Sequence, residues 1–125
     1  MKVIICGDRH WNNFDSIIDV VKRLKAKYGD ITIIQGECEG ADLLAKRAAV
    51  ACGVPVKGYP ADWKKYGKSA GPLRNQQMLD KEKPDMVIAF HPDIENSKGT
   101  KDMMEDITSA IQQGKKNSKK IPLKS

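Results

Sequence analysis

The chain has 125 residues, of which 40% are hydrophobic and 30% are charged, and its formal net charge at pH 7 is +6. This length suits one domain with one hydrophobic core, and the composition is that of an ordinary globular protein. No run approaches the roughly twenty apolar residues that span a bilayer, and the N-terminus lacks the features of a signal peptide. We therefore expect a cytoplasmic protein without a membrane partner.

Apolar runs and helical patterns alternate along the chain. Short β-branched runs predict strands at residues 2–6, 30–35, 54–59 and 85–91, and a shorter run at 120–123 could add a fifth. Apolar stripes with helical spacing predict helices at residues 14–28, 41–52, 72–82 and 99–114. This alternation is typical of a Rossmann-like α/β domain, with a mainly parallel sheet of four or five strands flanked by helices.

The positive charge is concentrated at the C-terminus. Residues 115–125 hold five of the 22 basic residues and no acidic residue, so the remainder of the chain is close to neutral. We expect a nucleotide-binding domain over residues 1–114 and a basic tail over residues 115–125, which includes the candidate fifth strand. A lysine-rich tail of this kind is solvated or contacts an acidic partner.

Glycines, aromatic residues and charges gather in the segments that follow the predicted strands. In open α/β sheets, ligands bind beyond the carboxyl ends of the strands. The segment GECEGAD places Gly36, Gly40 and Ala41 between a strand and a helix, where main-chain amides and the helix dipole favour an anion such as phosphate. Asp42 lies in the first helical turn, and a tight turn in which Asp42 only caps the helix is the alternative.

Two further segments carry arginine. The segment GDRHW, which begins at Gly7, brings Arg9 and Trp11 to the end of the first strand, which we expect to be central. The segment AGPLRN places Arg74 and Asn75 in the first turn of a helix, where a cation opposes the helix dipole. Arg74 could therefore bind an anionic ligand, and a surface ion pair is the alternative.

Two other candidate contacts have simpler alternatives. Trp63, like Trp11, could cover a base, although packing alone would also explain each aromatic ring. Gly99 and Thr100 could bind phosphate, although Thr100 could also be a plain helix cap.

Metal and thiol chemistry are disfavoured by the spacing of the candidate ligands. Three cysteines are present without a CxxC motif, and His10, His91 and Cys38 match no zinc-ligand spacing. We therefore expect reduced thiols, no metal and no cofactor.

The motifs taken together resemble the YspA-like branch of the SLOG superfamily of Rossmann-type domains. The stretches that carry the resemblance are GDRHW, GECEGADLLA, PADWKKYGKSAGPLRNQQML and DMVIAFH followed by GT, over residues 3 to about 114. The resemblance implies a nucleotide or nucleotide-derived ligand. Lonely Guy-type members are similar; they cleave the N-glycosidic bond of cytokinin nucleotides with an arginine and a glutamate, and they associate as dimers. Here Arg74 stands in the arginine position and Met103 in the glutamate position, which puts hydrolysis in doubt.

Three functions follow as hypotheses. The first is a domain that senses or sequesters a nucleotide-like ligand, with a homodimer as the assembly that the resemblance implies. The second is a hydrolase of an N-glycosidic or phosphoester bond in such a ligand, with Arg74 and Asp8 as candidate catalytic residues. The third is binding of single-stranded nucleic acid, against which the near-neutral body argues. The expected ligand contacts are Gly7, Arg9, Trp11, Gly36, Gly40, Ala41, Asp42, Trp63, Arg74, Asn75, Gly99 and Thr100.

Overall fold

A parallel sheet of five strands forms the centre of the computed structural model, which describes residues 1–91 and 119–123. The strands are β1 (Lys2–Gly7), β2 (Thr32–Gln35), β3 (Val56–Gly58), β4 (Met86–Phe90) and β5 (Lys119–Leu123), in the order β3-β2-β1-β4-β5. All four neighbouring pairs are parallel, so the predicted fold class is confirmed and the fifth strand is present. The helix predicted at 99–114, with Gly99, Thr100 and Met103, lies outside the described residues.

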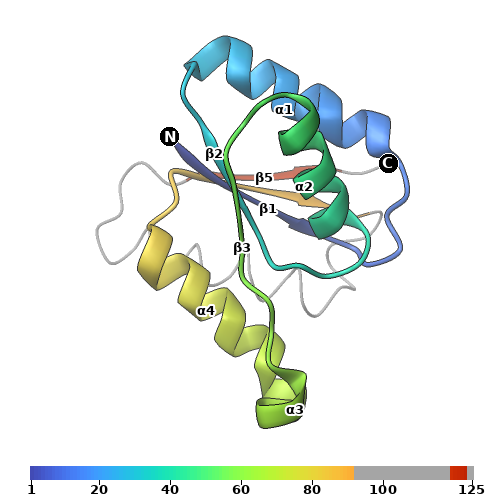
Figure 1. Ribbon diagram of the computed structural model, residues 1–125, viewed down its shortest axis with the longest axis vertical. Coiled ribbons are helices and arrows are strands. Elements are labelled where there is room, and N and C mark those ends of the chain that lie inside the picture. Colours follow the sequence, from blue (N-terminus) through green and yellow to red (C-terminus); the bar gives the residue numbers. More distant parts are fainter. Residues whose placement is uncertain (92–118, 124–125) are drawn as a thin grey trace.

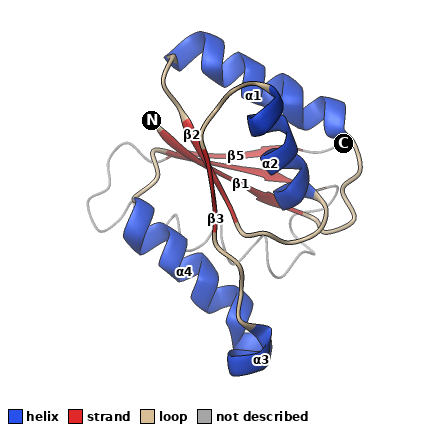
Figure 2. Cartoon of the chain, viewed as in Figure 1, coloured by secondary structure: helices blue, strands red, loops and turns tan. Residues whose placement is uncertain are grey.

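Helices cover both faces of the sheet (Figures 1 and 2). The helices are α1 (Phe14–Tyr28), α2 (Ala41–Ala51), the single-turn α3 (Trp63–Tyr66), a 3₁₀ turn (Gly67–Ser69) and α4 (Ala70–Glu82). Helices α1 and α2 lie together on one face, and α4 lies on the other. The sequence predicted neither α3 nor the 3₁₀ turn, and α4 begins two residues before the predicted Pro72.

The central strand β1 is buried on both faces, as the continuous apolar run in the sequence predicts. Val3 and Ile5 belong to the core cluster under α1 and α2, whereas Ile4 and Cys6 belong to the cluster under α4. Successive side chains of a strand point to opposite faces, so one strand contributes to both layers of the core. Strand β3 is shorter than the strand predicted at residues 54–59. Pro55 and Pro60 flank it and have no N–H to donate to the ladder.

The order of the strands fixes where the loops converge. The chain runs outward from β1 to β2 and β3, then returns to the other side of β1 to form β4 and β5. The order therefore reverses between β1 and β4, and this switch point is where open α/β sheets leave a crevice beyond their strand ends. The segment that follows β1 lies at this point.

Candidate functional site

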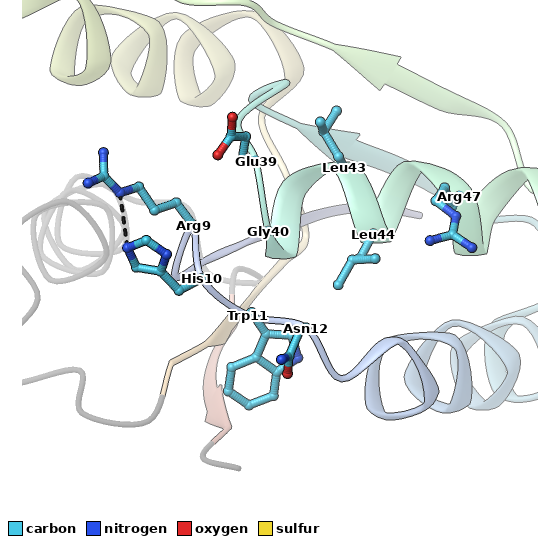
Figure 3. A pocket seen from close by; sticks show the side chains of 9 residues that line it. All are labelled: Arg9, His10, Trp11, Asn12, Glu39, Gly40, Leu43, Leu44 and Arg47. Carbon is cyan, nitrogen blue, oxygen red and sulfur yellow. Dashed lines mark hydrogen bonds between the residues drawn. The ribbon is translucent and has the colours of Figure 1, made fainter.

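An open pocket of about 460 Å³ lies where the segment after β1 meets the start of α2 (Figure 3). The segment after β1 contributes four consecutive residues, the loop before α2 contributes two and α2 itself contributes three. The nine lining residues are Arg9, His10, Trp11, Asn12, Glu39, Gly40, Leu43, Leu44 and Arg47. The pocket thus lies at the carboxyl ends of β1 and β2, at the edge of the sheet where the sequence predicted a ligand site.

Two glycines allow the segments around the pocket to approach each other. A Cβ atom on Gly40 would lie 2.3 Å from the carbonyl oxygen of Asp8, and Gly40 has a φ of 79°. The neighbouring Ala41 amide donates to that same Asp8 oxygen at 3.2 Å. A Cβ atom on Gly7 would lie 2.1 Å from the carbonyl oxygen of Phe90. Only glycine fits these two positions, because the obstacles are main-chain atoms that cannot rotate away.

The pocket is flanked by positive charge. Figure 3 shows Arg9 and His10 at one end and Arg47 at the other, with Leu44 between them. Arg9 is exposed, and its Nε donates to Nε2 of His10 at 3.3 Å. The guanidinium of Arg47 lies 4.8 Å from the centre of the Phe14 ring, which holds it over an aromatic face. One carboxylate, Glu39, belongs to the same lining, so the pocket offers cations, an acceptor and an apolar wall.

Trp11 forms part of the pocket wall from within the core. Its side chain is 6% exposed and packs edge-on against Phe90, with ring centroids 5.5 Å apart. The indole N–H is shared between the carbonyl oxygen of Asn13 at 3.2 Å and the hydroxyl of Ser16 at 3.1 Å. These contacts anchor the segment after β1, and they leave only a small part of the Trp11 ring for a ligand.

A second cluster lies beneath the predicted phosphate loop. A single oxygen of Asp42, Oδ2, accepts from the amides of Gly36 at 3.2 Å and Cys38 at 3.3 Å. On the other side of the loop, Nη1 of Arg74 donates to the carbonyl oxygen of Gly36. Nε of Arg74 donates to Oδ1 of Asn75 at 2.8 Å. The Gly36 amide therefore already donates to Asp42, and the carboxylate stands where the sequence suggested a phosphate.

The Asp42 carboxyl is buried, and burial raises its pKa to about 6. The charge of Arg74 and the two loop amides act in the opposite direction, because each favours the ionised form. Beneath this carboxyl, burial also raises the pKa of the Cys6 thiol far above its ordinary value, with the Asp42 charge as the next cause. Arg74 thus has an internal role that explains why a cation stands in the first turns of α4.

The other predicted site residues are not among those that line the pocket. Oδ1 of Asp8 accepts the His10 amide at 3.2 Å, and neither Asp8 nor Arg74 is among the nine lining residues. Trp63 is also outside the lining, and it is 54% exposed on α3.

Sequence reasoning missed several residues that line the pocket. These are His10, Asn12, Leu43, Leu44 and Arg47. A signal was present for the last three, because they follow Gly40 at spacings of three, four and seven residues, which share one face of a helix.

The part of the chain that the structure describes has neither a cluster of metal ligands nor a membrane-spanning helix. Within residues 1–91 and 119–123, no three His, Cys, Asp or Glu side chains gather closely enough to hold a metal ion. No helix of this part of the chain has the length and apolar character needed to cross a bilayer.

Comparison with known proteins gives three similarities. A family model described as the YspA, cpYpsA-related SLOG family matches residues 1–66. The gene 61 protein of Mycobacterium phage D29 is 32% identical over 120 residues, which cover 87% of this chain and 90% of that protein. The structure of DNA processing protein A from Streptococcus pneumoniae matches with a TM-score of 0.59 at 16% identity, over 96% of this chain. The chain spans 58% of that structure, and at such low identity the likeness shows the fold alone.

Proposed function

Since the chain belongs to the YspA, cpYpsA-related SLOG family, we propose that it binds a nucleotide or nucleotide-derived ligand and senses or sequesters it. Family and fold are both compatible with nucleotide or nucleic-acid binding. We assign the ligand to the carboxyl ends of the parallel strands. We also propose a cytoplasmic location and a homodimer. Light scattering in solution would measure the mass of the assembly.

The observation that carries the proposal is the pocket between Arg9 and Arg47. Two guanidinium groups at a strand-end pocket suit a phosphorylated ligand, because the planar fork of arginine matches phosphate oxygens. Gly40 allows the ligand to approach the main chain closely. Leu44 offers an apolar surface for a base, and the Glu39 carboxylate is an acceptor for ribose hydroxyls.

The phosphate contacts are assigned to these side chains rather than to the loop amides. The Gly36 amide donates to Asp42 and the Ala41 amide donates to Asp8, so both would have to give up an internal bond to bind a ligand. Gly99 and Thr100 stay proposed phosphate contacts on the segment that follows β4.

Binding without turnover is the function we favour over hydrolysis. The arginine in the hydrolase position, Arg74, donates to Gly36 and Asn75, and the carboxylate of Asp8 accepts the His10 amide. Met103 occupies the position in which the hydrolases carry a glutamate. A hydrolase needs a carboxylate at the reacting bond, and of the two candidate catalytic residues only Asp8 has one, which accepts the His10 amide and does not line the pocket.

Calorimetric titration of the full chain with ADP-ribose, AMP and cyclic AMP tests the proposal. At least one should bind, and Arg9→Ala and Arg47→Ala should each weaken it by about 10- to 100-fold, the worth of a hydrogen bond to a charged group. Arg23→Ala is the matched control, since Arg23 is exposed on α1 and pairs with Asp19. The proposal fails if none of the three binds, or if both pocket variants retain the wild-type affinity. If chromatography shows that the bound nucleotide is consumed, the result would favour the hydrolase instead.

A further inference from the structure

Helix α3 carries an exposed aromatic and basic surface, which we call the α3 patch. Figure 1 shows α3 at the end of α4, projecting away from the sheet. Its apolar members are Trp63, Tyr66 and Leu73, which are 54%, 44% and 48% exposed. Its basic members are the exposed Lys64, Lys65 and Lys68. Large aromatic side chains that remain this open on a small domain are typical of binding surfaces.

The local structure places both rings on one side of α3 and supports the ring of Trp63. Trp63 and Tyr66 are three residues apart, so one helical turn brings them to the same side. Oδ1 of Asp62 accepts the Lys65 amide at 3.1 Å and caps this turn. A Cβ atom on Gly71 would lie 3.3 Å from the Trp63 ring, so the glycine in α4 makes room for it. Trp63 is therefore supported along one edge, and more than half of its surface remains open.

The charge of the patch selects an anionic partner. From Ala61 to Leu73 the sequence holds Lys64, Lys65 and Lys68, whereas Asp62 is the single acidic residue. Nζ of Lys65 lies 5.1 Å from the centre of the Tyr66 ring, so cation and aromatic ring already share one surface. A second copy of the same patch would be repelled by its lysines, which argues against self-association here.

We propose that the α3 patch binds single-stranded nucleic acid. Trp63 and Tyr66 provide faces on which unpaired bases stack, and Lys64 and Lys68 contact the phosphates between them. Alternation of aromatic rings and lysines suits a single strand, because it offers bases and phosphates in alternation. The surface is separate from the proposed nucleotide pocket, since neither ring is among its lining residues.

The two tryptophans make the test specific. Trp11 is 6% exposed and Trp63 is 54% exposed, so quenching of tryptophan emission by an added oligonucleotide reports on the patch. Adding an oligothymidylate of twelve nucleotides to the full chain at low salt should quench the tryptophan emission. In fluorescence anisotropy with a labelled oligonucleotide, Trp63→Ala and Tyr66→Ala should each weaken binding by about 5- to 100-fold, and Trp63→Phe should weaken it less.

Salt dependence separates the lysines from the rings. Lys64→Ala should lower the slope of log affinity against log salt concentration by about 0.7, the value for one phosphate contact on a single strand. Lys22→Ala, an exposed lysine on α1, is the matched control and should leave the slope unchanged. Circular dichroism of each variant verifies the fold before the titration.

Four results would overturn the proposal. The first is no quenching at low salt. The second is unchanged affinity in both alanine variants of the rings. The third is tighter binding of phosphatidylserine vesicles or polyglutamate than of the oligonucleotide at equal charge, since a membrane or an acidic protein would then be the partner. Displacement of the oligonucleotide by excess ADP-ribose would also contradict the proposal, because both ligands would then share one site. If the chain binds no ADP-ribose, the proposed nucleotide pocket fails, but the oligonucleotide titrations still test the α3 patch.

Discussion

The guanidinium of Arg74 donates a hydrogen bond to the carbonyl oxygen of Gly36, and so joins α4 to the end of β2. Arg74 approaches the loop from one face of the sheet, while Asp42, on the helix that covers the other face, accepts the amide of the same glycine. The loop of the GECEGAD segment is therefore held between an arginine and an aspartate.

Removing Arg74 should destabilise the protein. Arg74→Ala leaves the buried Gly36 carbonyl without its donor and Asp42 without a neighbouring positive charge. The free energy of unfolding in urea should fall by about 1–3 kcal/mol, the cost of an unsatisfied buried group. Arg23→Ala removes an exposed ion pair with Asp19 and should cost less than about 1 kcal/mol. Equal losses in the two variants would contradict the role given to Arg74.

Gly36→Ala should disturb the same contact by steric overlap. A Cβ atom there would lie 2.3 Å from Nη1 of Arg74 and 2.8 Å from Oδ2 of Asp42. The loss of stability should be smaller in an Arg74→Ala background, and a double-mutant cycle should give a coupling of about 0.5–3 kcal/mol. Gly29→Ala is the comparison, because nothing lies within 4 Å of that position and only its φ of 75° is unfavourable. Additive losses for Gly36 and Arg74 would show that the overlap is relieved elsewhere.

The buried Asp42 carboxyl predicts a pH dependence of stability. Its pKa in the folded protein is raised from 3.8 to about 6, so its contribution is fully present below pH 3.8 and is lost as the pH rises through about 6. The stability of the wild type relative to Asp42→Asn should therefore fall over this range, by up to about 3 kcal/mol.

Urea unfolding of both proteins between pH 4 and pH 7 measures this difference. Asp80→Asn is the control, since Asp80 is exposed on α4 and accepts a hydrogen bond from Gln76. A wild type and an Asp42→Asn variant whose stabilities run parallel across this range would refute the assignment.

The buried Glu82 carboxylate predicts the opposite sign. It accepts from the Tyr59 hydroxyl, and it lies 3.2 Å from Nζ of Lys57 and 3.3 Å from Nζ of Lys2. The Tyr59 bond is the first cause of the lowered Glu82 pKa, and the same bond raises the pKa of Tyr59 to about 12. A lowered folded pKa gives stability that is present above about pH 4.5 and is lost as the pH falls.

Tyr59→Phe should therefore cost about 1.5–3 kcal/mol at pH 7, and less at pH 3, because the contribution of the ionised carboxylate is lost as the pH falls. Thermal and urea unfolding at both pH values measure the loss. Tyr28→Phe is the matched control, because among the described residues the Tyr28 hydroxyl makes no hydrogen bond. A loss that is the same at pH 3 and pH 7 would remove the carboxylate from the explanation.

Much of the fold could be predicted from local pattern. β1 and β4 are continuous apolar runs, and the helix after β1 carries an apolar stripe that begins behind Asn13, whose side chain accepts the Ser16 amide. Such features depend on neighbours within a few residues, so the sequence shows them directly.

The candidate site was only partly predictable. The sequence indicated the edge of the sheet and the glycines at positions 7 and 40, because a strand-to-helix turn with glycine is a local feature. It did not indicate that Asp42 would take the Gly36 amide, or that Arg74 would approach the same loop from 38 residues away. Contacts across the sheet depend on strand order and on the angle at which each helix packs, neither of which leaves a local signature.

The sequence by itself determined the alternation of strands and helices, the parallel sheet and the strand ends as the chemically dense edge. These follow from hydrophobic period, β-branching and chain breakers, which act over short distances. Only the tertiary structure decided which charges meet there: Arg74 and Asp42 are directed inward to hold a loop, whereas Arg9 and Arg47 flank the pocket. The physical reason is that the role of a charged side chain depends on which partners lie within its reach. Those partners are brought together only by folding.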